Sequence, residues 1–408
     1  MGSRRRAAAS ARRGSRVLSA ALRAVLIGAL LAACASRQGD TRETAGELRE
    51  VRIGYFGPDD PDHPVGGSLW QGTLLAVEEA NASGGYRGLP FRLVQDWDEN
   101  PWSGGAAGVA RMVYRDEVWA LIGGIDGTST HLAEQVVAKA RLALVDPAST
   151  DRTVNSANVP WLFSSMPADP ALMATLGEAL LASPGRASFI LASATDHDSR
   201  IMAREFLTSV QSGHGVPLRH FEFGRGSHRI PELAKQIAEA GTAAVVVLAG
   251  ASDSAALVRE LRAAGADSVL FGGPAVGRRS FLDAAGGAAE GVRLPLTVWQ
   301  TEGSEGFGER FEARWSGAPD YAALHAYDST RLLVAAIRQA GLDRARIRAA
   351  LEALSPWQGV SGVIRWDEIG RNARGARLGL IRGGGVRPAG PREERPIRTP
   401  ASASPDSG

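Results

Sequence analysis

Short apolar runs alternate with longer segments of helical periodicity through the middle of the chain. The run VRIGYF at 51–56 has the composition of a buried strand, and residues 68–82 repeat their apolar positions with the period of a helix. The same pairing returns further along the chain. We expect strands also at 91–97, 118–124, 142–147, 187–193, 243–250 and 268–273, and helices at 103–115, 129–140, 170–182, 198–212, 230–240 and 253–265. Continuous apolar strands that alternate with amphipathic helices are typical of parallel sheets covered on both faces, so the sequence predicts an α/β, doubly wound fold.

Five loops of this predicted fold are placed to bind a ligand. In such sheets, ligands bind at the carboxyl ends of strands, where loops meet helix N-termini. The loops at that position are 57–67, 124–130, 146–153, 193–199 and 249–254. They are rich in small or hydroxyl-bearing residues, namely Gly127, Thr128, Ser129, Ala148, Ser149, Thr150, Ser193, Thr195, Ser199, Ser252 and Ser254. Helix capping explains each hydroxyl group alone, whereas five such loops from two sheets favour a shared cleft for a carboxylate or amide oxygen.

The N-terminal residues have the pattern of an export signal. Residues 1–16 are basic and contain no acid, and residues 17–31 form an apolar stretch interrupted by Arg23. This stretch is shorter than the about 20 apolar residues that a membrane-spanning helix needs. It ends in the string LAAC at 31–34, which resembles the lipobox of bacterial lipoproteins, whose cysteine is acylated and becomes the first residue of the mature chain. We therefore predict a lipoprotein signal peptide at 1–33 and a lipid anchor on Cys34, with a buried structural cysteine as the alternative.

The two ends of the mature chain differ in composition from its body. Residues 34–50 are small and polar, as in a tether, and residues 384–408 are dominated by Gly, Pro, Ser and Arg, so we expect a disordered tail there. A content of 44% hydrophobic and 22% charged residues is typical of a globular protein, and a length of 408 residues favours two domains. The single cysteine excludes an intrachain disulfide and a multi-cysteine metal site. The formal net charge of +2 is not concentrated in a block of the kind that binds nucleic acid.

The order of the elements and several motifs resembles one known family. The motifs are IGYFGPDD at 53–60, GTLLAVEEANASGGYRGLPFRLVQDWDENP at 72–101, VWALIGGIDGTST at 118–130, LALVDPAST at 142–150, YAALHAYDSTRLLVAAIRQAG at 321–341 and GVSGVIRWDEIGR at 359–371. In this order they resemble the type I periplasmic binding proteins, specifically the branched-chain amino acid (Leu/Ile/Val) binding family. Each motif alone is weak, but together they run through nearly the whole body of the chain.

The resemblance implies two lobes joined by three crossing strands, which close on a ligand by hinge motion. The crossings would lie near 164–167, 297–301 and 354–359. Lobe one would then comprise 51–166 plus 299–355, and lobe two 168–297 plus 357–383. The implied function is that of a lipid-anchored, monomeric solute-binding protein of the cell envelope that delivers a small amino-acid-like solute to the permease and ATPase subunits of an ABC importer. A ligand-sensing receptor subunit that uses the same cleft to report to a signalling partner is the alternative.

The family's ligand contacts carry over unevenly. The resemblance places the loop that holds a carboxylate on 127–129, with Gly127 where a serine is usual, and the loop that holds carboxylate and ammonium on 148–150. The lobe-two aromatic falls on His197, and the acid that pairs with the ammonium falls on Pro274. The predicted ligand-binding set, completed by two residues of the loop 249–254, is Gly127, Thr128, Ser129, Ala148, Ser149, Thr150, His197, Ala251, Ser252 and Pro274.

The missing acid bears on the chemistry of the ligand, because a buried ammonium without a carboxylate partner is costly. Either Asp196, Asp198 or Asp253 supplies the charge, or the ligand is not an α-amino acid. With Pro274 in place of the acid, we expect the ammonium side of the site to be less demanding than in the amino-acid binders. An amide or a deaminated analogue would then bind nearly as well as the amino acid.

The sequence contains no motif of a known catalytic class. GxSxG, HExxH and P-loop motifs are absent, and no GxGxxG follows a strand. His214, His220 and His228 are close in sequence without matching acids, and we interpret them as surface residues. His131 and His325 are interpreted as packing residues. We therefore predict a protein that is not an enzyme and that holds neither a cofactor nor a metal.

Overall fold

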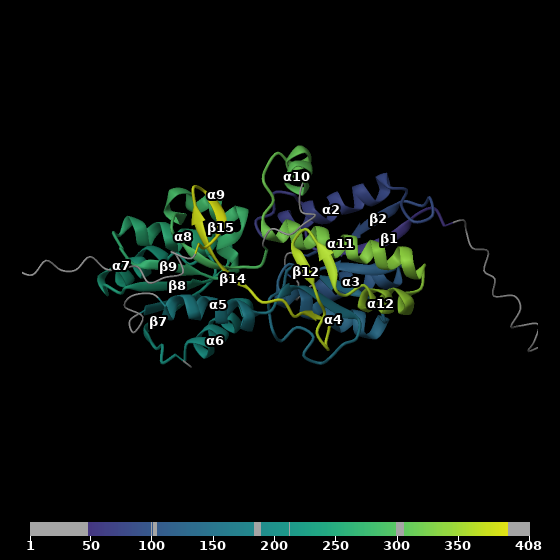
Figure 1. Ribbon diagram of the computed structural model, residues 1–408. Helices are drawn as coiled ribbons and strands as arrows, with labels where there is room; N and C mark the ends of the chain where they lie inside the picture. Colours follow the sequence, from purple (N-terminus) through teal and green to yellow (C-terminus); the bar gives the residue numbers. More distant parts are fainter. Residues whose placement is uncertain are drawn as a thin grey trace, which may run out of the picture. The chain divides into compact units, whose positions relative to one another are not determined.

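Two sheets, each with helices on both faces, organise the chain from Val51 onward (Figure 1). The computed structural model describes residues 48–98, 100, 104–182, 189–211, 213–298 and 306–390. The predicted signal peptide, Cys34 and most of the predicted tether lie outside the described residues. Within the described ranges, no helix combines the length and the apolar character needed to cross a membrane.

The first sheet has the strand order β13-β5-β4-β3-β1-β2, and all its neighbouring strands are parallel. Its strands are β1 (Val51–Phe56), β2 (Phe91–Gln95), β3 (Ala120–Gly123), β4 (Leu144–Asp146), β5 (Leu162–Pro167) and β13 (Arg371–Asn372). The same part of the chain contains α2 (Gly67–Ala82), α3 (Ala106–Tyr114), α4 (Gly127–Ala140), α10 (Phe307–Trp315), α11 (Tyr321–Ala340), α12 (Arg344–Ala353), β11 (Trp357–Gly359) and β12 (Gly362–Ile364). We call these elements, residues 51–167 and 306–372, lobe one.

Successive residues of a lobe-one strand face opposite layers of helices. Leu121 in β3 packs in the same cluster as Met112 of α3. The next residue, Ile122, packs in the cluster that contains Leu332 of α11. All four side chains are fully buried, and burial of a side chain of this size contributes about 1.5–3 kcal/mol to stability. Both faces of the sheet are therefore core, which explains why its strands are continuous apolar runs.

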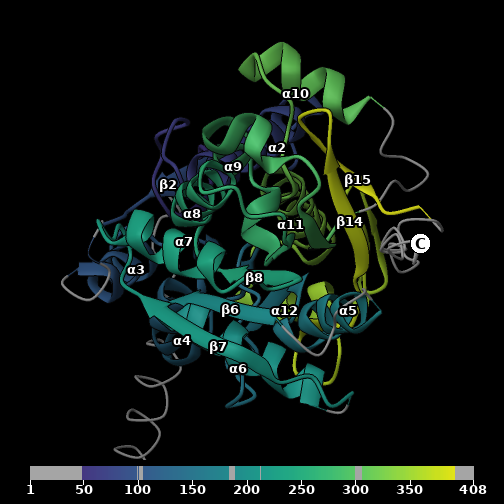
Figure 2. The same ribbon diagram turned by 90° about the vertical axis from the view of Figure 1, so that its left-hand side faces the viewer.

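The second sheet has the strand order β15-β14-β10-β9-β8-β6-β7, in which β14 and β15 form an antiparallel edge. Its strands are β6 (Phe189–Ala194), β7 (Pro217–Phe223), β8 (Ala244–Leu248), β9 (Val269–Gly272), β10 (Arg293–Leu296), β14 (Arg377–Arg382) and β15 (Gly385–Pro388). Its helices are α5 (Asp169–Leu181), α6 (His197–Gln211), α7 (Ile230–Glu239), α8 (Ala251–Ala263), α9 (Arg279–Ala285) and the short 3₁₀ turns η2 (Pro274–Gly277) and η3 (Gly286–Ala289). Figure 2 shows α6 on one side of this sheet and α7 and α8 on the other. We call these elements, residues 169–298 and 377–390, lobe two.

The chain passes between the lobes at points that the sheets define. Strand β5 of lobe one ends at Pro167, and helix α5 of lobe two begins at Asp169. The return to lobe one follows β10, and residues 299–305 of that connection lie outside the described residues. The last passage falls between Asn372 in β13 and Arg377 in β14. The predicted third crossing at 354–359 is therefore misplaced, because residues 357–372 belong to lobe one.

The packing of the β11–β12 hairpin explains this difference. Trp357 and Trp366 pack against the core of lobe one beneath α11 and α12. The backbone N–H groups of Val360 and Ser361 donate hydrogen bonds of 2.9 and 2.7 Å to the buried carboxylate of Asp328 in α11. Burial of two tryptophans and satisfaction of a buried carboxylate hold the hairpin on lobe one.

Part of the predicted disordered tail is a strand. Strand β15 pairs with β14 through a turn at Gly383 and Gly384, whose φ angles are 60° and 74°. Positive φ at both central residues is what a tight type I′ hairpin requires, and glycine adopts it without strain. Val386 packs against the core of lobe two. The prediction of disorder for 384–408 is therefore wrong at 385–388, and residues 391–408 lie outside the described residues.

Candidate functional site

The N-terminus of α4 in lobe one is held by a capping box. Asp126 Oδ1 accepts a hydrogen bond of 2.8 Å from the Ser129 N–H, and Ser129 Oγ accepts one of 3.2 Å from the Asp126 N–H. Ser129 is fully buried, so its hydroxyl group, which the sequence predicts to contact a ligand, serves the helix cap. Gly127 and Thr128 form the first turn, where backbone N–H groups have no partner within the helix, and Thr128 is half-buried.

A carboxylate from lobe two lies at this helix N-terminus. Asp198 in α6 accepts a hydrogen bond of 3.0 Å from the Gly127 N–H through its Oδ1 atom. The positive end of the α4 dipole favours a negative charge at this position. A Cβ atom at residue 127 would collide with the Asp198 carboxylate and would lie 2.9 Å from the Cβ of Asp151. The close approach of Asp198 and Asp151 therefore favours glycine at this position.

The loop after β4 is organised by a buried acid that the sequence reasoning missed. Asp146 Oδ1 accepts hydrogen bonds of 2.9 Å from the Ala148 N–H and 3.0 Å from the Ser149 N–H. Burial raises the pKa of Asp146 to about 7, although these hydrogen bonds oppose the rise. Two of the predicted ligand donors therefore point their N–H groups at Asp146. Thr150, the third predicted residue of this loop, is half-buried, and its carbonyl accepts from the Asp169 N–H at 2.7 Å.

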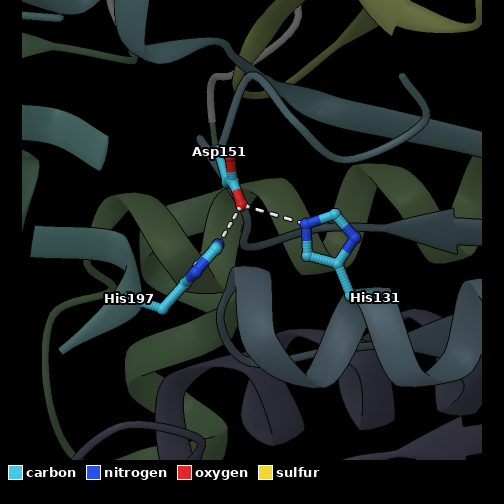
Figure 3. Close-up of side chains that lie close together, drawn as sticks. All are labelled: His131, Asp151 and His197. Atoms are coloured by element: carbon cyan, nitrogen blue, oxygen red, sulfur yellow. Dashed lines mark hydrogen bonds and ion pairs between the residues drawn. The ribbon is translucent and has the colours of Figure 1, made fainter. Parts of the chain in front are cut away.

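His131, Asp151 and His197 form a cluster at the boundary between the lobes (Figure 3). His131 comes from α4, Asp151 from the loop after β4, and His197 from the first residue of α6 in lobe two. Asp151 Oδ2 lies 3.1 Å from His131 Nε2 and 2.7 Å from His197 Nε2. The structure thus brings the predicted residue His197 to lobe one. It also gives a polar role to His131, which the sequence led us to interpret as a packing residue.

Hydrogen bonds within this cluster shift the pKa values of His131 and Asp151. Hydrogen bonds to Asp151 and Glu134 raise the pKa of His131 to about 10, against the effect of its burial. Burial acts to raise the pKa of the Asp151 carboxyl, but hydrogen bonds from His131, Thr153 and His197 outweigh it and hold that pKa well below its usual range. A negative charge on Asp151 is therefore stabilised by the two imidazoles together.

The same region holds more carboxylates than the cluster can pair. The pKa of Asp198 is raised well above its usual range. Burial is the largest cause, and repulsion from nearby carboxylates adds to it, namely those of Asp126, Asp151, Asp169 and Asp196. Asp169 is fully buried, and burial raises the pKa of its carboxyl well above the usual range although the Thr150 side chain opposes the rise. A region with this charge balance favours a cationic group of a ligand.

Three acids were alternatives for pairing with a ligand ammonium, and the structure separates them. Asp196 caps α6, where it accepts from the Ser199 N–H and hydroxyl at 3.1 and 2.8 Å. Asp253 accepts from the Gly226 N–H within lobe two at 2.9 Å. Asp198 is the acid of the three that bonds to lobe one.

The remaining predicted residues lie at the starts of α8 and η2 in lobe two. Ala251 begins α8 and is half-buried, and Ser252 beside it is exposed. Pro274 begins η2 and is buried. Four residues further, the Arg278 side chain forms an ion pair of 2.9 Å with Asp320, the N-cap of α11 in lobe one. This buried pair is a further polar link between the lobes.

The residues that the sequence reasoning missed carried a weak signal. His131 lies four residues after Gly127, so the two share one face of α4. Asp146 and Asp151 are in the loop 146–153, which the sequence already marked as a ligand loop. The approach of Asp151 to His197 depends on contact between the lobes, which no local pattern encodes.

The structure has two α/β lobes joined by crossing segments, and helix N-termini and charged side chains face each other across the boundary. This arrangement defines the class of two-lobed binding proteins. A family model described as periplasmic binding protein matches residues 50–385. The chain therefore belongs to the periplasmic binding protein family, and its fold is of type I, which confirms that part of the resemblance seen in the sequence.

Known proteins similar to this chain cover most of its length. The amino acid binding protein of Pseudomonas aeruginosa is 26% identical over an alignment of 355 positions, which covers 79% of this chain and 87% of that protein. The leucine-, isoleucine-, valine-, threonine- and alanine-binding protein of the same species is 24% identical over an alignment of 335 positions, which covers 78% of this chain and 86% of that protein. The structure of the branched-chain amino acid transporter substrate-binding protein LivJ from Streptococcus pneumoniae, in complex with isoleucine, has a TM-score of 0.76 at 21% identity and covers 83% of this chain and 97% of LivJ.

Proposed function

We propose that this protein is the solute-binding lipoprotein of an ABC importer, and that it binds a small amino-acid-like solute by closing its two lobes. The proposal assigns it no enzymatic activity. The relatives support the solute class, because two of them are named as amino acid binding proteins and a third as the substrate-binding protein of a branched-chain amino acid transporter.

One observation carries the proposal, which is the hydrogen bond of 3.0 Å from the Gly127 N–H of lobe one to the Asp198 carboxylate of lobe two. It marks a position between the lobes that accepts a carboxylate at a helix N-terminus. A solute carboxylate that enters the open cleft takes the N–H groups of Gly127 and Thr128 in place of Asp198. Hydrogen bonds between a carboxylate and backbone N–H groups are among the stronger ones in proteins.

The displaced Asp198 then pairs with the ammonium group of the solute. Its carboxylate is half-buried among other acids, so a neighbouring cation relieves both burial and repulsion. The sequence, with Pro274 in place of the family's acid, led to the expectation that the ammonium side of the site is undemanding. We propose the opposite, namely that the ammonium is a required part of the ligand.

Closure follows from the position of the polar groups. The pairs Gly127–Asp198, Asp151–His197 and Arg278–Asp320 each join lobe one to lobe two. Crossing segments of the chain also connect the lobes, and they absorb a rotation with small changes in backbone angle. A solute in the cleft adds contacts to both lobes and therefore stabilises the closed arrangement.

Solute binding is tested by thermal shift with a library of amino acids, amides and carboxylates, followed by isothermal titration of each compound that shifts the melting temperature. We expect at least one amino acid to bind with micromolar or tighter affinity, about −8 kcal/mol or better. X-ray scattering should show a smaller radius of gyration with that amino acid than without it. A library that produces no shift contradicts the proposed function.

The lipid anchor is tested separately, because Cys34 lies outside the described residues. Labelled palmitate should appear on the wild-type protein and not on the Cys34→Ser variant, which should leave the membrane fraction. Two or three acyl chains hold a protein at a membrane surface, at about 0.8 kcal/mol for each buried methylene group. Unlabelled wild-type protein would show that the lipoprotein assignment is wrong while leaving the solute-binding assignment intact.

A further inference from the structure

Three side chains from both lobes present metal-binding atoms to one another. His131, Asp151 and His197 each offer one such atom, and the three atoms lie within 4.8 Å of one another. In Figure 3 the two imidazole rings approach the Asp151 carboxylate from different elements, α4 and α6. Both imidazoles direct Nε2 at the same oxygen, Oδ2, at 3.1 and 2.7 Å.

We propose that His131, Asp151 and His197 bind a divalent metal ion of the zinc type, and that this ion joins the two lobes. Two imidazole nitrogens and one carboxylate oxygen form a ligand set that suits Zn²⁺, Co²⁺, Ni²⁺ and Fe²⁺. Such a set of three protein ligands leaves coordination positions open for water or for a small chelating solute.

The surroundings of the three residues have the arrangement of an outer ligand shell. Glu134 Oε2 lies 3.3 Å from His131 Nδ1, the ring nitrogen that faces away from Asp151. Asp151 Oδ1 accepts hydrogen bonds of 2.7 Å from the Thr153 N–H and 2.8 Å from its hydroxyl group. A carboxylate on the far nitrogen of a histidine orients its ring toward a metal, and hydrogen bonds to a ligating carboxylate fix its direction.

A second observation also favours a cation. Asp169 places a fully buried carboxylate beside Thr150, the residue before Asp151, because its backbone N–H donates to the Thr150 carbonyl at 2.7 Å. Asp198 adds another carboxylate next to Gly127. Arginine, the strongest competitor of a metal ion, is engaged elsewhere in this region, because Arg152 pairs with Glu205 at 3.2 Å. The alternative arrangement, in which the two histidines hydrogen-bond to Asp151 without any ion, is an outcome of the experiment below.

The site is tested by isothermal titration of Zn²⁺ into the full-length protein. The protein is purified in mild detergent and freed of metal with a chelator beforehand. We expect one Zn²⁺ to bind per chain with a Kd in the micromolar range or tighter. His131→Gln and His197→Gln should each weaken binding at least tenfold, because each removes one of three ligands. His228→Gln removes an exposed histidine of lobe two and should leave the affinity unchanged. Equal affinity in the wild type and both cluster variants would overturn the proposal.

Cobalt substitution gives a readout that does not depend on the variants. Co²⁺ bound by two imidazoles and a carboxylate in a four- or five-coordinate site absorbs visible light much more strongly than hexaaqua Co²⁺. We expect these bands on addition of one equivalent of Co²⁺ to the wild type and their loss on addition of Zn²⁺. A spectrum of hexaaqua Co²⁺ alone would contradict the site. The solute library is measured on metal-free protein, so failure of the metal site and failure of the proposed function are distinguishable.

Discussion

The guanidinium of Arg278 in lobe two lies 2.9 Å from the carboxylate of Asp320 in lobe one, and both side chains are buried. Arg278 also donates to the Val65 carbonyl at 2.6 Å, in the loop after β1 that the sequence marked as a ligand loop. Asp320 in turn caps α11 through the N–H groups of Ala322 and Ala323. The pair therefore couples a loop of lobe two to the start of the longest lobe-one helix.

We predict that Arg278→Leu opens the lobes and lowers the free energy of unfolding by about 3 kcal/mol, because removal of one partner leaves a buried charge unpaired. Chemical denaturation and the radius of gyration measure the two effects. Arg279→Leu is the matched control, since Arg279 pairs with Asp283 within α9 at the surface and its loss should cost at most about 0.5 kcal/mol. Equal effects of the two substitutions would mean that the pair does not join the lobes.

Gly127→Ala should abolish solute binding. The added Cβ would collide with the Asp198 carboxylate and crowd Asp151, so the lobes no longer close around the α4 N-terminus. Within the helix itself alanine is favoured over glycine by about 1 kcal/mol, which offsets part of the cost of crowding Asp151 in the same lobe. We expect the affinity of the amino acid found in the library to fall at least a hundredfold in isothermal titration.

Gly287→Ala is the control for this substitution, because a Cβ at Gly287 meets open space. Its affinity for the amino acid should equal that of the wild type. Normal binding by Gly127→Ala would show that the closed arrangement with the solute differs from the one described at α4.

The apolar pattern was sufficient to predict most of the lobes. The sequence places a strand at 243–250 and a helix at 253–265, and the structure has β8 at Ala244–Leu248 and α8 at Ala251–Ala263. Both signals are local, because a strand buried on both faces must be apolar throughout and a helix between sheet and solvent must repeat its apolar positions. The family resemblance added the two-lobed arrangement, which no periodicity shows.

Features that depend on contact between distant segments were not predictable in this way. The β11–β12 hairpin was assigned to lobe two, since nothing in its local pattern reveals that Trp357 packs on lobe one. Asp151 and His197 are 46 residues apart and meet across the lobes. Ser129 was predicted to contact a ligand, and its hydroxyl group is used in the capping box. A Ser near a helix start fits both roles equally in sequence, so the structure was needed to separate them.

Asp146 should make the stability of the protein depend on pH. Its pKa of about 7 in the folded protein lies above the value of 3.8 for an ordinary aspartate, so between these values the folded chain holds a proton that the unfolded chain has released. The contribution of this group to the free energy of unfolding therefore falls as the pH rises through that window. Asp146→Asn keeps an oxygen acceptor for Ala148 and Ser149 and removes the charge.

Relative to the wild type, Asp146→Asn should gain about 3 kcal/mol in the free energy of unfolding between pH 5 and pH 8. Denaturant unfolding of both proteins at the two pH values measures this change. Asp283→Asn removes an exposed carboxylate and is the control, with the same offset from the wild type expected at both pH values. An offset for Asp146→Asn that does not change with pH would contradict a neutral Asp146 in the folded protein.

Asp198→Asn should show which end of the solute, the ammonium or the carboxylate, is bound by Asp198. The asparagine still offers an oxygen to the Gly127 N–H but carries no charge for an ammonium group. Loss of one partner of a buried charged pair costs about 1–3 kcal/mol, so the affinity for the amino acid should fall by roughly tenfold to a hundredfold. The deaminated analogue of the same amino acid lacks the ammonium, and its affinity should stay the same or rise because the cleft loses one negative charge. Isothermal titration of both compounds into both proteins completes a four-way comparison.

A loss of the same size for both compounds would place Asp198 on the carboxylate side of the solute. The acid that pairs with the ammonium would then have to be another one, such as Asp126 or Asp151.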